Sequence, residues 1–99
     1  MYNVHMKQLV FEWDKRKENV NIKKHGISFE EAKSVFFDEY ALLLADPDHS
    51  ETEDRFVLLG LSARLRLLLV CHCFEVDDNL IRVISCRKAT RKEMSLYRR

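Results

Sequence analysis

The most informative segment for the architecture is residues 55–88, RFVLLGLSARLRLLLVCHCFEVDDNLIRVISCRK. Residues 55–62, 65–74 and 80–86 are rich in leucine, valine and isoleucine, and short polar stretches separate them. Such runs are typical of β-strands joined by turns. The first turn is expected at residues 63–64 and the second at residues 76–79. The segment therefore predicts three consecutive strands of an antiparallel sheet.

Upstream of this segment the pattern changes from strand to helix. Residues 7–13 (KQLVFEW) are β-prone and predict a first strand. The polar stretch that follows predicts a helix with Asp14 as its N-cap and Gly26 just after its end, where glycine is favoured. The capping-box pattern SFEE and the helical spacing of the next apolar residues predict a second helix at residues 28–37.

Two further elements complete the order. Residues 40–45 are a short apolar run that predicts a strand, and the acidic stretch DPDHSETED follows it at residues 46–54. Thr90 and Glu93 repeat the capping-box pattern and predict a basic C-terminal helix. The predicted order is β-α-α-β-β-β-β-α. This is an α+β fold, in which an antiparallel sheet carries the two N-terminal helices on one face.

Length and composition exclude several classes of protein. A chain of 99 residues is expected to form a single domain, residues 1–99, of two packed layers. It has no apolar run near the roughly 20 residues of a membrane span and no secretory signal, so a cytoplasmic protein is expected. It contains no GxSxG, P-loop or HExxH motif, and only two glycines. The common hydrolase and nucleotide-binding classes are therefore disfavoured.

The three cysteines, Cys71, Cys73 and Cys86, cannot all pair within one chain. Cys71 and Cys73 alternate along one predicted strand and point to the same face, too close in sequence for an easy disulfide. No CxxC pair exists, which disfavours zinc and thioredoxin-like sites. We expect three free thiols in a reducing compartment.

The net charge of +1 hides a strong asymmetry along the chain. Residues 26–54 carry nine acidic and one basic residue, whereas residues 55–99 carry ten basic and four acidic residues. This distribution suggests an anionic partner for the basic part and a cationic partner for the acidic part. The alternative is that these charges only keep the surface soluble.

Strand alternation suggests where chemistry could occur. Along residues 65–74, Arg66 and His72 share one face, and the opposite face is wholly apolar and is expected to face the core. Arg82 on the next strand would join the open face. Arginine binds phosphate in a bidentate manner and histidine exchanges a proton near neutral pH, so this face suits a phosphodiester. The alternative, that the arginines pair with acidic residues and His72 is a packed core residue, stays open.

Two other stretches are candidates for binding. The acidic residues of 46–54 could chelate a hard cation, but their spacing matches no EF-hand and the loop has no glycine. A solvated loop is favoured, and no metal or cofactor is predicted. The basic segment 87–99, RKATRKEMSLYRR, could lie along a nucleic-acid backbone. The alternative for that segment is a solvated helix face.

Several motifs, spread in order over residues 6–97, together resemble a known family. They comprise FEWD at 11–14, KHGI at 24–27, DPDHS at 46–50, GLS at 60–62 and IRVISCRKAT at 81–90, followed by Glu93 and Tyr97. In this order they resemble the motifs of BrnT toxins. One departure is Leu65, at a hairpin position where the family usually has glycine, which makes a turn with positive φ harder to form.

The resemblance implies a RelE-like fold and a ribonuclease toxin of a type II toxin–antitoxin pair. Its partner would be a BrnA-type antitoxin with a ribbon-helix-helix part. The complex would repress its own operon and contact operator DNA only through the antitoxin. The released toxin would cut RNA and stop translation and growth. No membrane partner is implied.

By analogy with RelE-like enzymes, the catalytic surface is expected on the open sheet face and at the last strand-to-helix junction. We expect the RNA 2′-OH to attack the adjacent phosphate without a metal. The expected catalytic residues are Arg66, His72, Arg82 and Lys88, and the expected RNA-binding residues are Arg55, Arg87, Arg91 and Tyr97. His25, beside a helix end, is expected to complement the helix dipole rather than to act in catalysis. The alternative function is a non-catalytic module that binds a partner or acts as a co-repressor.

Overall fold

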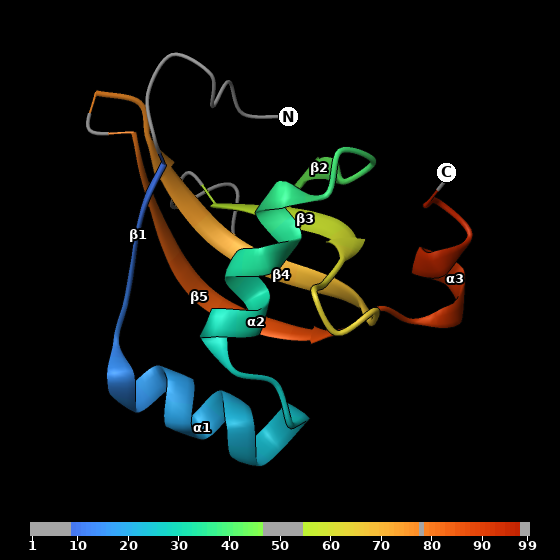
Figure 1. Cartoon of the computed structure of the whole chain (residues 1–99), viewed down its shortest axis with the longest axis horizontal. Helices are drawn as coiled ribbons and strands as arrows, with labels where there is room; N and C mark the ends of the chain where they lie inside the picture. Colours follow the sequence, from blue (N-terminus) through green and yellow to red (C-terminus); the bar gives the residue numbers. More distant parts are fainter. Residues whose placement is uncertain (1–8, 47–54, 78, 98–99) are drawn as a thin grey trace.

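The computed structural model describes residues 9–46, 55–77 and 79–97, which form a five-stranded sheet with helices on its faces (Figure 1). The elements are β1 Val10–Trp13, α1 Lys15–His25, α2 Phe29–Ser34 with a 3₁₀ turn at Val35–Phe37, β2 Leu42–Ala45, β3 Arg55–Leu61, β4 Leu67–Glu75, β5 Leu80–Lys88 and α3 Arg91–Met94. The predicted α+β class and element order are confirmed. In the part of the chain described, no helix has the length and apolar character needed to cross a membrane.

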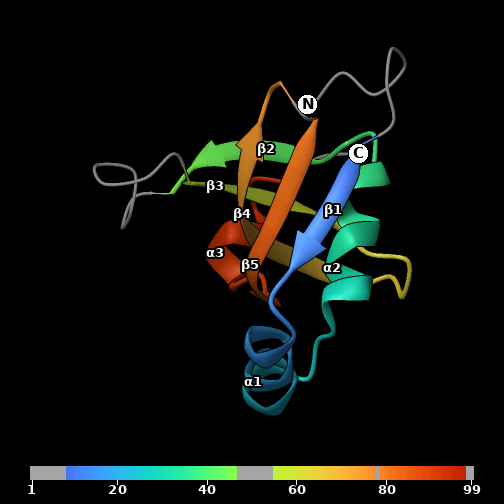
Figure 2. The same cartoon turned by 90° about the vertical axis from the view of Figure 1, so that its left-hand side faces the viewer.

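The strands lie in the order β1-β5-β4-β3-β2 (Figure 2). The strands β2 to β5 form the antiparallel succession that the sequence predicts. The first strand, β1, joins the edge beside β5 in parallel, with Val10 opposite Leu80 and Trp13 opposite Val83. The sheet is therefore mixed, with one parallel pair at the edge where the chain turns into α1.

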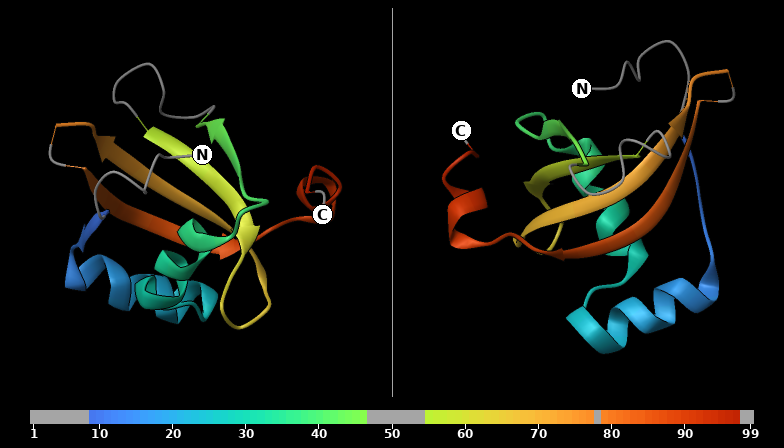
Figure 3. Two further views of the ribbon diagram at one scale, coloured as in Figure 1. Left: turned by 45° about the horizontal axis from the view of Figure 1, so that its top comes forward. Right: turned by 180° about the vertical axis from the view of Figure 1, so that it is seen from behind.

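One face of the sheet carries α2 and most of the core, and α3 lies on the other side (Figures 2 and 3). On the α2 side, Phe29 and Phe36 are buried with Val70 and Ile81 in one apolar cluster. Fully burying side chains of this size contributes about 1.5–3 kcal/mol each. This cluster fixes the position of α2 against the sheet.

The structure reverses the predicted orientation of β4. The face with Leu68, Val70 and His72 is fully buried under α2, whereas Leu69 and Cys71 on the opposite face are only half-buried. Both faces of this central strand carry mainly apolar residues, and the two polar residues on one of them led alternation to the wrong assignment. The prediction that Arg66 and His72 stand on the open face is therefore wrong.

Capping residues set the bounds of α1 and α2. Asp14 accepts hydrogen bonds from the backbone N–H groups of Arg16 and Lys17, and Gly26 ends α1 in the left-handed conformation at φ 70°. Ser28 caps α2 by accepting from the Glu31 N–H at 3.1 Å. These caps were predicted from the sequence. The Glu31 carboxylate, however, turns toward the β3–β4 hairpin.

A side chain of α1 hydrogen-bonds the edge of β5 in the part of this strand that does not pair with β1. The buried Asn21 donates from Nδ2 to the carbonyl oxygens of Cys86 (2.9 Å) and Ile27 (3.0 Å). Its Oδ1 accepts from the Cys86 N–H at 3.0 Å. The amide thus makes with β5 the two hydrogen bonds that a neighbouring strand would make, and it fixes α1 against the sheet.

The β3–β4 hairpin turns through Leu65 in the left-handed conformation, at φ 63°. The Leu65 N–H donates to the Ser62 carbonyl at 2.9 Å, and the Ser62 N–H donates to the Arg66 carbonyl at 2.8 Å. This is a three-residue hairpin loop whose last residue must have positive φ, a position that suits glycine. Leu65 adopts it nonetheless, with its side chain 78% exposed.

Candidate functional site

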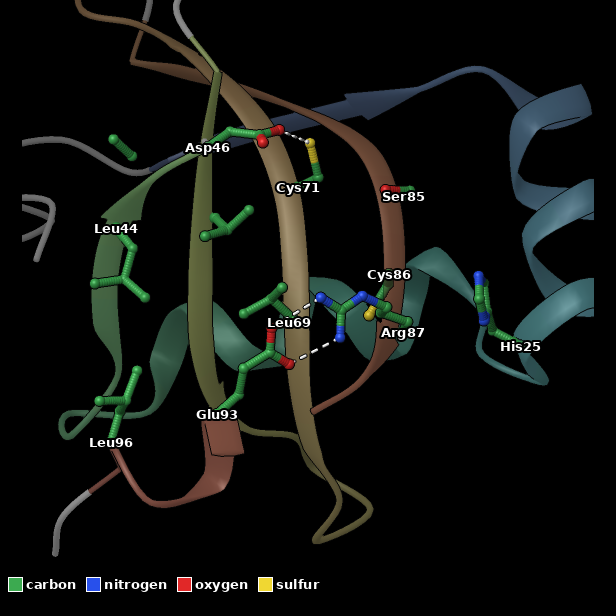
Figure 4. A pocket seen from close by; sticks show the side chains of 12 residues that line it. His25, Leu44, Asp46, Leu69, Cys71, Ser85, Cys86, Arg87, Glu93 and Leu96 are labelled. Carbon is green, nitrogen blue, oxygen red and sulfur yellow. Dashed lines mark hydrogen bonds and ion pairs between the residues drawn. The ribbon is translucent and has the colours of Figure 1, made fainter. Parts of the chain in front are cut away.

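A cavity of about 400 Å³ lies on the sheet face opposite α2 (Figure 4). The inner strands supply its floor, and the end of α1 and the C-terminal helical segment contribute to its walls. The lining residues are His25, Leu44, Ala45, Asp46, Val57, Leu69, Cys71, Ser85, Cys86, Arg87, Glu93 and Leu96. The cavity therefore combines an apolar floor with a few charged and titratable groups, which is typical of a binding site.

Arg87 and Glu93 form the charged centre of this cavity. Arg87 donates from Nη1 and Nη2 to the two carboxylate oxygens of Glu93 at 2.8 and 2.9 Å. The hydrogen bonds from Arg87 lower the pKa of Glu93 to about 2. Glu93 also accepts from the Thr90 N–H, and Thr90 caps α3 in return, so the predicted capping box is present. The cap thus positions the carboxylate that orients Arg87.

Residues after α3 fasten this segment to the rest of the molecule. Tyr97 donates its hydroxyl to Asp38 Oδ2 at 2.6 Å, and the same oxygen accepts from the Leu61 N–H at 2.8 Å. Gly60 lets this loop approach β3, because a Cβ there would lie 2.9 Å from Val35 Cγ1 and 3.1 Å from Asp38 Oδ2. The C-terminal segment is therefore held at both ends, by Arg87 and by Asp38.

A second polar contact lies at the far end of the cavity. The thiol of Cys71 donates to Asp46 Oδ2 at 3.4 Å, and Asp46 is buried (Figure 4). Burial, reinforced by the Asp46 carboxylate, raises the pKa of Cys71 to about 12. Cys71 is therefore an unreactive thiol at neutral pH. None of Cys71, Cys73 and Cys86 forms a disulfide, as the sequence predicts.

Three of the predicted site residues lie at the junction between β5 and α3. Arg87 lines the cavity, Lys88 is exposed at the end of β5, and Arg91 is exposed at the start of α3. Arg87 Nη1 also donates to the Lys88 carbonyl at 3.2 Å. The junction therefore presents a short run of cationic side chains beside the cavity.

Arg66, in contrast, is bound on the α2 side of the sheet. Its Nε donates to Glu31 Oε2 at 2.8 Å, its Nη2 contacts Glu31 Oε1, and Nη2 also donates to the Gly26 carbonyl at 3.3 Å. Ser62 Oγ donates to the same carboxylate at 2.7 Å. The hydrogen bonds from Arg66 lower the pKa of Glu31. Arg66 thus joins the hairpin to α2 and does not line the cavity.

His72 is fully buried in the core. Its ring lies edge-to-face against Phe36 with a centroid distance of 4.8 Å, and its Nδ1 is 3.1 Å from the Val70 carbonyl. Burial lowers the pKa of His72 to about 4, so the imidazole is neutral at neutral pH. This is the packed-histidine alternative that the sequence left open, and it separates His72 from the cavity.

Arg82 and Arg55 lie elsewhere on the sheet. Arg82 is exposed on β5 and donates from Nε to Glu12 Oε2 of β1 at 2.6 Å. Arg55 is half-buried at the start of β3, and its carbonyl accepts from the Asp46 N–H. The structure therefore does not bring the predicted catalytic set of Arg66, His72, Arg82 and Lys88 together in one site.

His25 and Glu93 line the cavity, although sequence reasoning placed neither in the catalytic or RNA-binding set. His25 was interpreted only as a dipole partner of α1, and Glu93 only as a helix cap. Their positions depend on how α1 and α3 pack at the end of β5, which no local pattern reveals. The predicted capping box at Thr90 and Glu93 could have indicated the position of Glu93, because a carboxylate in this cap has to lie near the end of the preceding strand.

The acidic loop lies largely outside the described residues, which include Asp46 but not residues 47–54. Within the described part, no group of three or more His, Cys, Asp or Glu side chains is arranged to hold a metal ion.

Comparisons with known proteins place this geometry in a family. The model of the family described as "Ribonuclease toxin, BrnT, of type II toxin-antitoxin system" matches residues 13–93. The crystal structure of the Brucella abortus ribonuclease toxin BrnT is similar in fold, with a TM-score of 0.64 and 24% sequence identity. That match covers 85% of this chain and all of the other. No curated protein matches the chain. The family match spans most of the sequence, and the chain therefore belongs to the BrnT family of ribonuclease toxins of type II toxin–antitoxin systems.

Proposed function

We propose that the chain is an endoribonuclease that cleaves RNA without a metal and does so in the cavity beside Arg87. The observation that carries this proposal is the Arg87 guanidinium, held in a bidentate geometry at the cavity wall. The same two parallel N–H groups that bind a carboxylate also match two oxygens of a phosphate. An RNA phosphate would therefore compete with Glu93 for Arg87.

The proposed reaction is an internal transfer of the phosphate. The 2′-oxygen attacks the adjacent phosphorus, the bond to the 5′-oxygen breaks, and a 2′,3′-cyclic phosphate and a 5′-hydroxyl result. One proton leaves the 2′-hydroxyl and one reaches the departing 5′-oxygen. Arg87 stabilises the charge that develops on the phosphate oxygens, and the exposed Lys88 and Arg91 hold the neighbouring backbone.

For proton transfer we propose His25 in place of His72. His25 lines the cavity at the end of α1, whereas His72 is enclosed in the core. Imidazole is the side chain best suited to exchanging protons near neutral pH. Glu93 is less suited as a base, because Arg87 holds its pKa near 2.

The biological setting proposed here follows from membership of the family. Cleavage of cellular RNA would stop translation and growth in the cytoplasm. A BrnA-type antitoxin would bind the chain, neutralise it and, together with it, repress their shared operon at operator DNA. The acidic character of residues 26–54 supports a partner with basic segments.

The test is digestion of a mixed RNA by purified, antitoxin-free protein in excess EDTA. We expect cleavage that persists in EDTA and yields ends with cyclic phosphate. Cleavage that requires magnesium would contradict metal independence. The absence of cleavage under both conditions would contradict the ribonuclease assignment for the isolated chain.

A non-catalytic, partner-binding module is the second candidate. It is favoured by the Arg87–Glu93 pair itself, because a guanidinium already paired with a carboxylate is electrically neutralised. The apolar side chains of Leu44 and Leu96 also line the cavity, and both are exposed enough to receive a partner. The same digestion distinguishes the two candidates, because only the enzyme shortens RNA.

A further inference from the structure

We propose that a second groove, between α1 and the free edge of β5, binds the RNA backbone on one side of the cleavage site. This inference rests on the proposed ribonuclease function and extends it to a subsite. The groove has a volume of about 310 Å³ and is lined by Arg16, Lys17, Val20, Asn21, Lys24, His25, Ile84 and Ser85. It lies where β1 has ended and where the Asn21 amide, rather than a neighbouring strand, hydrogen-bonds the outer edge of β5 at Cys86.

The groove continues into the cleavage cavity. His25 and Ser85 line both, and Figure 4 shows Ser85 on β5 and His25 at the end of α1. A strand whose reacting phosphate lies at Arg87 would therefore pass His25 and enter the groove. This continuity is the reason to assign the groove to the substrate.

The charge of the groove is positive. Arg16, Lys17 and Lys24 are exposed, and within the described residues none of the three forms an ion pair with a carboxylate. No acidic residue is among those that line the groove. Lys17 and Lys24 are separated by two turns of α1, about 10 Å along the axis, so they can contact different phosphates. The groove thus has the charge that a nucleic-acid backbone requires.

The floor of the groove is apolar. Val20 is 63% exposed, although it lies on a helix that packs against the sheet, and Ile84 also lines the groove. Cationic sides over an apolar floor suit a single strand, whose phosphates meet the charges while its sugars and bases cover the apolar surface. An acidic segment of a partner protein would use the charges, but it would not need the groove to continue into the cleavage cavity.

The experiment compares two double variants that each remove two lysine charges. K17Q/K24Q changes the groove, and K23Q/K33Q changes exposed or half-exposed positions outside it. Binding is measured by fluorescence anisotropy with a 2′-O-methyl RNA of about a dozen nucleotides, which cannot undergo internal attack. We expect K17Q/K24Q to weaken binding by roughly tenfold and to make the plot of log K against log salt shallower by about 1 to 1.5. The control variant should change neither quantity to this extent.

A second measurement places the groove relative to the cleavage site. For K17Q/K24Q we expect kcat/KM to fall more for cleavage of the long RNA than for a dinucleotide, which fills only the cavity. The subsite proposal is wrong if kcat/KM falls equally for the long RNA and the dinucleotide. It is also wrong if the two double variants weaken RNA binding equally. If K17Q/K24Q binds RNA as well as the wild type but binds the antitoxin more weakly, the groove is a site for the protein partner instead. If the wild-type protein binds the RNA analogue but cleaves no RNA, the proposed ribonuclease function is wrong. The RNA affinities of the two double variants then still show whether the groove binds RNA.

Discussion

At the scale of single residues, Arg87 and Glu93 are the pair on which function and local structure both depend. The carboxylate orients the guanidinium, caps α3 through the Thr90 N–H, and occupies the positions that phosphate oxygens would take. Because Arg87 is partly exposed, the ion pair itself contributes little to the free energy of unfolding. Substitutions here should therefore affect RNA cleavage more than folding.

The variant Arg87→Ala is expected to lower the rate of RNA cleavage by about 10²–10³, because the main charge-stabilising donor is lost. Arg87→Lys should recover only part of the rate, since an ammonium group cannot bind two phosphate oxygens in parallel. Initial rates on one RNA substrate give the comparison. Arg64→Ala, at an exposed position of the hairpin, is the control. If Arg87→Ala cleaves RNA at the wild-type rate, Arg87 is not part of the cleavage site.

Leu65 is strained by its left-handed backbone conformation. We expect Leu65→Gly to raise the free energy of unfolding by about 0.5–1 kcal/mol, because glycine adopts positive φ without a steric penalty. Urea unfolding measures the change. Ala63→Gly in the same turn is the matched control and should destabilise the protein, since Ala63 does not have positive φ. A lower urea midpoint for Leu65→Gly would contradict this explanation.

At the scale of elements, the contact between α1 and β5 depends largely on one amide side chain. Asn21→Ala leaves the Cys86 N–H and C=O without their partner, in a buried position. We expect a loss of about 2–4 kcal/mol in the free energy of unfolding. Hydrogen exchange at the Cys86 amide should also become faster.

The control for this prediction is Asn19→Ala, an exposed position on the same helix. It should change stability by no more than about 0.5 kcal/mol. If both variants unfold at the same urea concentration, the edge of β5 does not need the Asn21 amide.

The elements themselves were predictable because each is specified locally. Asp14, Gly26, Ser28 and Thr90 mark helix ends by chemistry that acts within a few residues. The orientation of β4 was not predictable, because both of its faces carry enough apolar residues to pack against a core. The polar residues used to distinguish them were misleading: His72 is buried as a neutral ring, and Arg66 reaches around the hairpin to Glu31.

The candidate site was less predictable than the elements. Arg87, Lys88 and Arg91 are close in sequence, so their proximity follows from the strand-to-helix junction. His25 enters the cavity only because Asn21 fixes α1 against β5. A contact over this sequence distance leaves no local signal in the pattern of residues.

At the scale of the whole molecule, His72 makes stability depend on pH. Its pKa is about 4 in the folded protein, against an ordinary value of 6.5, because burial disfavours the charged ring. The unfolded chain therefore binds a proton that the native state does not bind as pH falls from 6.5 toward 4. Above pH 6.5 the buried ring therefore carries no penalty. As the pH falls from 6.5 to 4, the free energy of unfolding decreases, by about 2 kcal/mol between pH 7 and pH 5.

The measurement is urea unfolding of wild-type protein and His72→Leu at pH 7 and pH 5. The variant is expected to be less stable at pH 7, because it loses the contact with the Val70 carbonyl. Its stability should change less than that of wild type between the two pH values. Equal changes in both proteins would show that other groups cause the pH dependence.

The parallel pairing of β1 has a consequence for when the protein can become toxic. Glu12 and Arg82, joined across β1 and β5, are 70 positions apart, whereas β2 to β5 pair with near neighbours in the chain. Contacts that close such a long loop form late, and a chain emerging from the ribosome cannot make them until β5 has been synthesised. The β5–α3 junction, with Arg87 and Glu93, leaves the ribosome later still. Because the proposed cleavage site includes this junction, we expect the nascent chain to lack ribonuclease activity for most of its synthesis, which would leave time for an antitoxin to bind it as it folds.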